Sequence, residues 1–414
     1  MVSVEVVHEV QGHINNVTCA KFLPKDQVFI TGSEDQSLRV WVMRENGVWW
    51  PCSIEFLDSS ITCLDFDTES RTLVVGTANG VVMLYSVSKD FNTVERVSVM
   101  RAHTGNVCAV AANGADGFIA SCGDDYLFQV HSISSKQRLG QYKAAVGLKS
   151  MCLVCDENTN DTSVYVGTDG GEILALSVSE TGTVSFGPAL DGHKSAVTSL
   201  AYANSCRTLI SGSQDKLVGL WKLDEMSSTS SGTSTPISVR PILLHKHTAP
   251  VTSVTYSSLT NEALTVDAEG MCCIWDMSVE REPPVTWHIS DMCELCEKPF
   301  FWKVQETPVS VGSFNFSLPK FNVNRQHHCR QCGKAACINC VPHKILLTKN
   351  GYEVPVYVCR ECFPALSPDV SKPTVHVVKL KDMCKVECMG DSDQFTAVHK
   401  DFAARVIKFE KNSR

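Results

Sequence analysis

Residues 31–35 read Thr-Gly-Ser-Glu-Asp and residues 38–41 read Leu-Arg-Val-Trp, so a polar tight turn is followed closely by an apolar run. The same pattern returns at residues 211–215, which read Ser-Gly-Ser-Gln-Asp, and a tryptophan, Trp221, follows again. Gly, Ser and Asp favour tight turns, and short apolar runs between such turns favour strands. This part of the chain is therefore predicted to be all-β and repetitive.

The repeat has a period close to 45 residues. Positions equivalent to Trp41 follow at steps of 44, 46, 45, 45 and 54 residues, and the last step is long because a Ser/Thr-rich insertion, residues 227–236, interrupts it. These positions are Trp41, Tyr85, His131, Leu176, Trp221 and Trp275. Such a period, built of short strands, predicts a β-propeller of four-stranded blades.

This repeat resembles the WD-repeat propeller. In such a blade the histidine of the loop that enters it is expected to bond to the aspartate of the tight turn, because buried polar groups need partners. The resemblance implies structural ties between His13 and Asp35 and between His193 and Asp215. A catalytic His-Asp dyad is the alternative, but it requires a nucleophile, and the sequence positions none.

Four repeats depart from the pattern. The second and fourth keep the turn without the histidine. The third keeps His103 and Asp125 but has His131 in place of tryptophan, and the sixth has His247 together with Glu269 where aspartate is usual.

A seventh blade is expected to join the two ends of the chain. Residues 385–389, 394–399 and 405–409 read as three short strands, and the N-terminal run 2–7 supplies the fourth. This pairing would leave no free sheet edge. Residues 373–380 read as the outer strand of blade six.

The sequence therefore predicts that a cysteine-rich segment is inserted within blade six. We expect residues 1–280 to form blades one to six and the strand that closes blade seven, and residues 285–365 to form the inserted module. Residues 373–414 would then form the outer strand of blade six and the rest of blade seven. A module that metal ions stabilise can be inserted without a large core of its own.

Eight cysteines of this segment form four C-x-x-C pairs, which offer enough thiolates for two closed tetrahedral Zn²⁺ sites without an open position for catalytic water. The pairs are Cys293/Cys296, Cys329/Cys332, Cys337/Cys340 and Cys359/Cys362. The two zinc ions are expected to be structural.

A basic core lies beside the second pair, where residues 325–330 read Arg-Gln-His-His-Cys-Arg. Because the cysteines saturate two metals, His327 and His328 are not needed as ligands. Guanidinium groups suit phosphate, and imidazoles suit phosphate or hydroxyls. The alternative is a solvated basic turn beside a metal site.

Composition narrows the function. The chain has 414 residues with 43% hydrophobic and 20% charged residues, which is typical of soluble globular proteins. A net charge of −8 argues against general nucleic-acid binding, while residues 285–365 contain nine Lys/Arg and six Asp/Glu. The start lacks a signal-peptide pattern, so the remaining twelve cysteines are expected to be reduced thiols of a cytosolic protein.

The segment resembles the FYVE zinc finger, whose marks are an initial W-x-x-D, a core R-(R/K)-H-H-C-R and a final R-V-C. Here the initial motif, Trp287 to Asp291, is one residue longer, Gln326 replaces the second basic residue, and Tyr357 replaces the final arginine. WD-repeat proteins with a FYVE finger inserted before the last blade form a family that this chain resembles from end to end.

The resemblance implies a cross-brace of two Zn²⁺ ions and binding of phosphatidylinositol 3-phosphate. One zinc set would be Cys293, Cys296, Cys337 and Cys340, and the other Cys329, Cys332, Cys359 and Cys362. Arg325 and Arg330 would contact phosphate, and Asp291 and His328 inositol hydroxyls, with His327 also in the headgroup site. Phe321 and Val323 would enter the bilayer, although their alternating pattern also fits a half-buried strand.

The sequence therefore predicts a non-enzymatic adaptor on the cytosolic face of early endosomes, whose propeller recruits signalling or trafficking proteins such as kinases. Self-association would strengthen its membrane binding. A RING-like module of a ubiquitin ligase is an alternative, although all eight candidate ligands are cysteine. A nucleic-acid module is weaker because no basic helix accompanies the cysteines. A finger with only a structural role is the third alternative.

Overall fold

A computed structural model describes residues 2–155, 161–223, 240–300, 325–366, 373–380, 383–388, 394–399, 401 and 403–411. The chain forms two compact units, residues 1–279 with 375–414, and residues 280–374. Each unit has its own apolar core.

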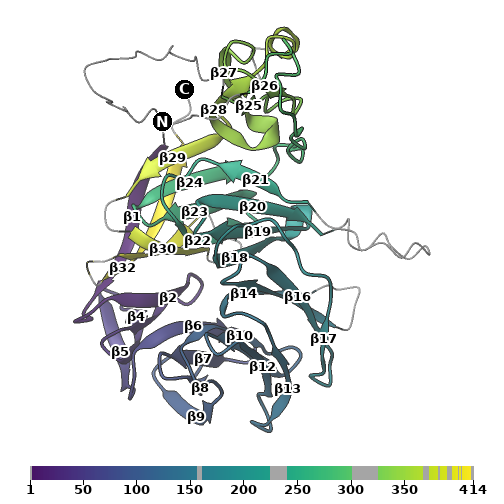
Figure 1. Cartoon of the computed structure of the whole chain (residues 1–414). Helices are drawn as coiled ribbons and strands as arrows, with labels where there is room; N and C mark the ends of the chain where they lie inside the picture. The colour runs from purple at the N-terminus through teal and green to yellow at the C-terminus, as the bar shows by residue number, and fades with distance from the viewer. Residues whose placement is uncertain are drawn as a thin grey trace, which may run out of the picture. The chain divides into compact units, whose positions relative to one another are not determined.

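The first unit consists of seven antiparallel sheets of four strands each (Figure 1). Blade one contains β2 (Val17–Leu23), β3 (Val28–Ser33), β4 (Ser37–Met43) and β5 (Trp49–Phe56). Blade two contains β6 (Ile61–Asp67), β7 (Thr72–Thr77), β8 (Val81–Val87) and β9 (Val94–Arg101). Blade three contains β10 (Val107–Asn113), β11 (Phe118–Gly123), β12 (Leu127–Ser132) and β13 (Arg138–Lys143).

The other blades follow the same order. Blade four contains β14 (Leu148–Cys155), β15 (Thr162–Thr168), β16 (Ile173–Val178) and β17 (Val184–Phe186). Blade five contains β18 (Val197–Ala203), the 3-10 turn η1 (Asn204–Cys206), β19 (Thr208–Ser213), β20 (Leu217–Lys222) and β21 (Ile242–His245). Blade six contains β22 (Val251–Ser257), β23 (Glu262–Asp267), β24 (Met271–Asp276) and β29 (Val375–Lys379).

Burial changes systematically across a blade. All residues of the second strands β3, β7, β11 and β19 are buried, whereas residues of the outer strands, such as β5 and β9, are partly or fully exposed. Continuous apolar runs such as Val28-Phe29-Ile30 fit a strand covered on both faces, because neighbouring blades pack against each side. This packing of blade on blade makes up the core of the first unit.

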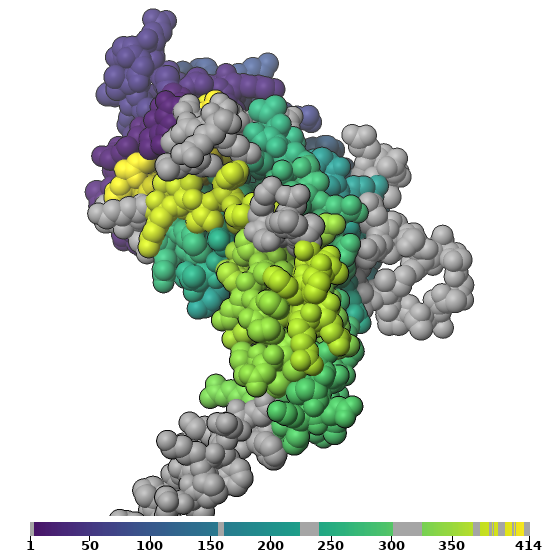
Figure 2. Space-filling view, turned by 90° about the horizontal axis from the view of Figure 1, so that it is seen from above, coloured from purple at the N-terminus to yellow at the C-terminus, as the bar shows by residue number. Residues whose placement is uncertain are grey.

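The two ends of the chain form blade seven. Strand β1 (Val2–Gln11) pairs with β32 (Ala403–Lys411), and the sheet continues through β31 (Gln394–His399) to β30 (Met383–Cys388). In the space-filling view the yellow C-terminal residues lie beside the purple N-terminal residues (Figure 2). The predicted all-β, seven-bladed fold is confirmed.

The second unit is small and largely irregular. Its regular elements are β25 (His327–His328), β26 (Ala335–Ala336), β27 (His343–Leu347) and β28 (Tyr352–Val358), with 3-10 turns η2 (Thr348–Asn350) and η3 (Phe363–Ala365). The core contains five of its cysteines with Val341, Leu347, Tyr352 and Val358. Throughout the described ranges, no helix has the length and apolar character needed to cross a membrane.

Candidate functional site: two cysteine quartets and a basic surface

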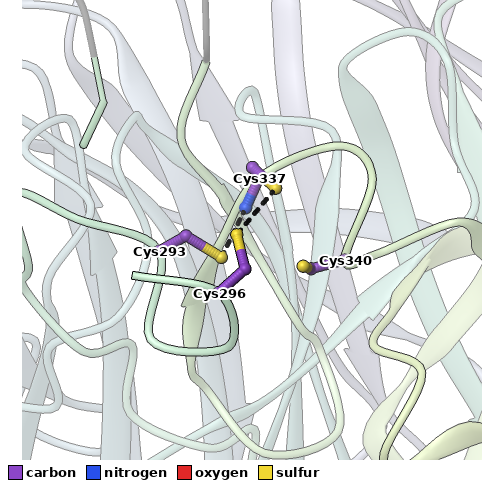
Figure 3. Close-up of side chains that lie close together, drawn as sticks. All are labelled: Cys293, Cys296, Cys337 and Cys340. Carbon is purple, nitrogen blue, oxygen red and sulfur yellow. Dashed lines mark hydrogen bonds between the residues drawn. The ribbon is translucent and has the colours of Figure 1, made fainter. Parts of the chain in front are cut away.

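The first cysteine quartet joins segments that are distant in the sequence. The sulfur atoms of Cys293, Cys296, Cys337 and Cys340 all lie within 4.8 Å of one another (Figure 3). The sulfurs of Cys296 and Cys337 are 3.7 Å apart, and the backbone N–H of Cys337 donates to Cys293 Sγ at 3.3 Å. Four convergent thiols with such a backbone donor match a tetrahedral zinc site.

The second quartet repeats this geometry. Cys329, Cys332, Cys359 and Cys362 lie within the same limit, and the N–H of Cys359 donates to Cys329 Sγ at 3.3 Å. The chain therefore contributes pairs one and three to one site and pairs two and four to the other. This is the grouping that the cross-brace resemblance implied.

The thiols themselves favour a bound cation. Burial acts to raise the pKa of Cys293, but backbone N–H groups of Cys337, Leu295 and Cys296 donate to it and lower its pKa to about 7. Burial and neighbouring thiols raise the pKa of Cys340 and Cys362. Four thiolates so close together would repel one another, and one Zn²⁺ in each quartet removes this repulsion.

Matching turns follow the first cysteine pair and the second. The N–H of Glu297 donates to the carbonyl of Cys293, and the N–H of Gly333 donates to that of Cys329. Both residues have a positive φ, 57° at Glu297 and 81° at Gly333. At Gly333 a Cβ would lie 2.2 Å from the carbonyl oxygen of Thr286, so this position requires glycine.

The basic core lies directly before the second quartet. Strand β25 holds His327 and His328 and pairs with β26. The indole of Trp287 stacks on the imidazole of His328 with centroids 4.9 Å apart and planes inclined by 15°. The guanidinium of Arg330 lies 4.2 Å from the centroid of the same indole. Trp287 thus contacts both candidate headgroup residues and restricts their orientation.

Tyr357 occupies the position of the missing arginine and contacts His327. The two ring centroids are 4.9 Å apart, and the carbonyl of Tyr357 accepts the backbone N–H of Arg330. The ammonium of Lys344 lies 4.6 Å from the tyrosine ring on the antiparallel strand β27. Sequence reasoning did not find Lys344, because only the pairing of β27 with β28 brings it here.

Positive charge accumulates around His327. Burial lowers the pKa of this histidine, and the charges of Arg325, Arg330, His328 and Lys344 lower it further. Arg325 is exposed, whereas Arg330 and both histidines are half-buried. Arg325, His327, His328 and Arg330 form a compact cationic surface, which we call the basic surface.

The predicted roles of Asp291, Phe321 and Val323 stay predictions. The carboxylate of Asp291 is exposed and has no ion pair with any residue that the structure describes. Phe321 and Val323, the predicted membrane-inserting residues, lie outside the described residues, as does the Ser/Thr-rich insertion.

The predicted ties in the propeller are hydrogen-bonded. His13 Nδ1 lies 2.9 Å from Asp35 Oδ2, and His193 Nδ1 lies 3.0 Å from Asp215 Oδ2. Nε2 of each histidine is hydrogen-bonded to a hydroxyl group. The same hydroxyl accepts the indole N–H of the following tryptophan, as Thr31 does from Trp41 at 2.9 Å. The aspartate, histidine, hydroxyl and tryptophan thus form one chain of hydrogen bonds. Because their polar atoms are paired with one another, a structural role fits them.

Blade six corrects the expectation for Glu269. His247 Nδ1 bonds instead to Asp267 Oδ2 at 3.1 Å, and Asp267 also accepts the backbone N–H groups of Glu269 and Met271. Asp267 ends β23, where Ser33 ends β3 in blade one. An aspartate at the end of β23, two residues before the usual position, thus bonds to the histidine, and Glu269 is free to differ.

The geometry defines a class of protein: an all-β propeller that carries, within the sequence of blade six, a two-zinc cysteine module with a basic surface. Comparison with known proteins then identifies both parts. The family model for the FYVE zinc finger matches residues 286–368, and that for the WD domain, G-beta repeat, matches residues 4–42, 52–86, 94–131 and 186–222.

Similarity extends over most of the chain. WD repeat and FYVE domain-containing protein 1 of Mus musculus is 30% identical over 364 residues, which cover 88% of this chain and 83% of that protein. WD repeat and FYVE domain-containing protein 2 of Caenorhabditis elegans is 28% identical over 359 residues, 86% of this chain and 80% of that protein. This chain belongs to the WD repeat and FYVE domain-containing protein family.

A solved structure supports the fold alone. The crystal structure of the WD40 beta propeller domain of Doa1 matches 99% of this chain and 98% of its own with a TM-score of 0.59 at 14% identity.

Proposed function

We propose that this protein is a non-enzymatic adaptor whose finger binds phosphatidylinositol 3-phosphate on the cytosolic face of early endosomes. The observation that carries the proposal is the basic surface, where Arg325, His327, His328 and Arg330 surround the buried ligand Cys329. A zinc-anchored backbone fixes these side chains and reduces the entropy lost when they bind an anion. The propeller recruits protein partners through its exposed loops and outer strands.

Apolar side chains near the basic surface support binding to a bilayer rather than to a free anion. Ile289 is fully exposed, and Met292 is about half exposed. They lie in the segment that Gln326 and His328 hold through hydrogen bonds to the carbonyls of Ser290 and His288. An apolar contact beside a cationic site suits a membrane with anionic headgroups.

Vesicle co-sedimentation of the zinc-loaded full chain tests the proposal. Vesicles with phosphatidylinositol 3-phosphate are compared with vesicles that contain phosphatidylinositol or its 4-phosphate. We expect selective binding to the 3-phosphate, its loss in Arg330→Ala, and no change in Lys349→Ala, which removes an exposed lysine of η2. Equal binding to all three lipids, with two zinc ions per chain, would leave the finger a structural role only.

A RING-like ligase function is the alternative. An autoubiquitination assay with purified conjugating enzymes is expected to give no product.

A further inference from the structure

Lys344 brings an additional cation to the basic surface from a different strand. It lies opposite Tyr357 in the antiparallel pair of β27 and β28, and its ammonium is 4.6 Å from the centroid of the tyrosine ring. The same ring contacts His327 at 4.9 Å between centroids. The order in space is therefore lysine, tyrosine, histidine.

The cations of this surface have no carboxylate partner within the described part of the chain. Among the described residues, no ion pair is formed by Arg325, Arg330 or Lys344, although Lys334 of the same unit pairs with Glu361 at 2.8 Å. Cations held together without counter-charges repel one another and create a positive potential. Such an arrangement is stabilised when a polyanion binds between them.

The tyrosine makes the lysine suitable for this role. An ammonium over an aromatic face gains an attraction that holds the flexible side chain near one place without neutralising its charge. An arginine at position 357 would project from nearly the same place, since directly opposed residues have Cβ atoms about 4.5–5.5 Å apart. Lys344 can therefore supply from β27 the charge that Tyr357 does not supply from β28.

We propose that Lys344 is a phosphate-binding residue of the finger, which donates from its ammonium to a phosphate of the lipid headgroup while Tyr357 supports its aliphatic stem and charge. This inference rests on the proposed function. It adds a specific contact that neither the core motif nor the cysteine spacing contains. It also gives Tyr357 a role in binding. If the arginine had simply been lost, the residue at position 357 would have no such role.

Soluble inositol 1,3-bisphosphate provides the test, because it has the headgroup phosphates without a bilayer. Titration calorimetry on the zinc-loaded full chain is expected to show binding that Lys344→Ala weakens about tenfold, as for loss of a charge-assisted hydrogen bond. Lys349→Ala, on the same hairpin, is expected to bind as the wild type does. Adding Tyr357→Arg to Lys344→Ala is expected to restore most of the affinity.

The possible failures differ from one another. Unchanged headgroup affinity in Lys344→Ala overturns the inference but leaves the proposed function intact. Weaker binding to vesicles alone, with the soluble headgroup bound normally, also overturns it, because Lys344 would then act only through general attraction to anionic lipid. A wild-type protein that binds neither the headgroup nor the vesicles would refute the proposed function and the inference together. Two zinc ions per chain in each variant confirm that the finger is folded.

Discussion

Trp287 stacks on His328 with ring centroids 4.9 Å apart, and the guanidinium of Arg330 lies 4.2 Å from the centroid of the same indole. Trp287→Ala should leave both side chains less ordered and weaken headgroup binding about three- to tenfold, since each aromatic contact contributes about 0.5–1.5 kcal/mol. Trp287→Phe retains a stacking surface and should lose less. Calorimetry with inositol 1,3-bisphosphate measures both variants, and equal affinity of Trp287→Ala and wild type would show that the stack has no role in binding.

Removal of zinc should unfold the finger and spare the propeller. Five of the ten buried residues in the finger's core are cysteine ligands, whereas the clusters of the propeller contain none of them. The calorimetric scan after chelation is expected to lack one of the unfolding transitions of the zinc-loaded protein and to retain the transition of the propeller. Metal analysis should give two zinc ions per chain in the wild type, fewer in Cys337→Ser, and two in the control Cys155→Ser, whose thiol is exposed in β14. A chelated protein with an unchanged scan would contradict a structural zinc.

Ile289 should contribute to binding of membranes and not of the headgroup. Ile289→Ala removes a fully exposed apolar side chain, and loss of its insertion should weaken binding to vesicles about tenfold. Its affinity for the soluble headgroup should not change. Ile338→Ala serves as the control, because Ile338 is exposed on the same unit between Cys337 and Cys340. Equal losses in the two variants would mean that general hydrophobicity, not this segment, determines membrane binding.

Asp267 should be essential to blade six, and Glu269 should be dispensable. Asp267 is buried and bonded to His247 and two backbone N–H groups, so Asp267→Ala leaves these donors without a partner. We expect a loss of about 3 kcal/mol in the free energy of unfolding, against less than about 0.5 kcal/mol for Glu269→Ala. Urea denaturation followed by tryptophan fluorescence measures both, and the reverse order would assign the tie to Glu269.

His131 should make the propeller less stable in mild acid. Burial, followed by the charges of His103 and Arg138, lowers its pKa in the folded protein to about 4, and its Nδ1 is buried with no hydrogen-bond partner among the residues that the structure describes. Above pH ~6.5 the histidine is neutral in both states. Between pH ~6.5 and 4 the unfolded chain takes up a proton that the folded chain does not, so stability falls as pH falls, by about 2 kcal/mol at pH 4.5.

The variant His131→Phe should remove this part of the pH dependence. Denaturation midpoints at pH 7.5 and 4.5 are expected to differ less in the variant than in the wild type. His376→Gln, a change at an exposed histidine of β29, should keep the wild-type difference. If both variants follow the wild type, the acid sensitivity arises elsewhere.

Features that depend on local spacing could be predicted from the amino-acid sequence alone. A period near 45 residues required short strands and tight turns, and four C-x-x-C pairs required two metal sites, because both patterns are fixed by neighbours along the chain. The seven blades could also be counted, since the N-terminal run had no other sheet to complete. The grouping of the cysteine pairs into two metal sites could be predicted only from the family resemblance.

Contacts between side chains that are distant in the sequence became visible only in the folded chain. The spacing of 22 residues that joins His13 to Asp35 would have placed the partner of His247 at Glu269, but Asp267 reaches the imidazole from the end of β23. Lys344 faces Tyr357 because of the register of β27 and β28. Such partners depend on side-chain length and on cross-strand register, which are set when the strands pair and cannot be read from either segment alone.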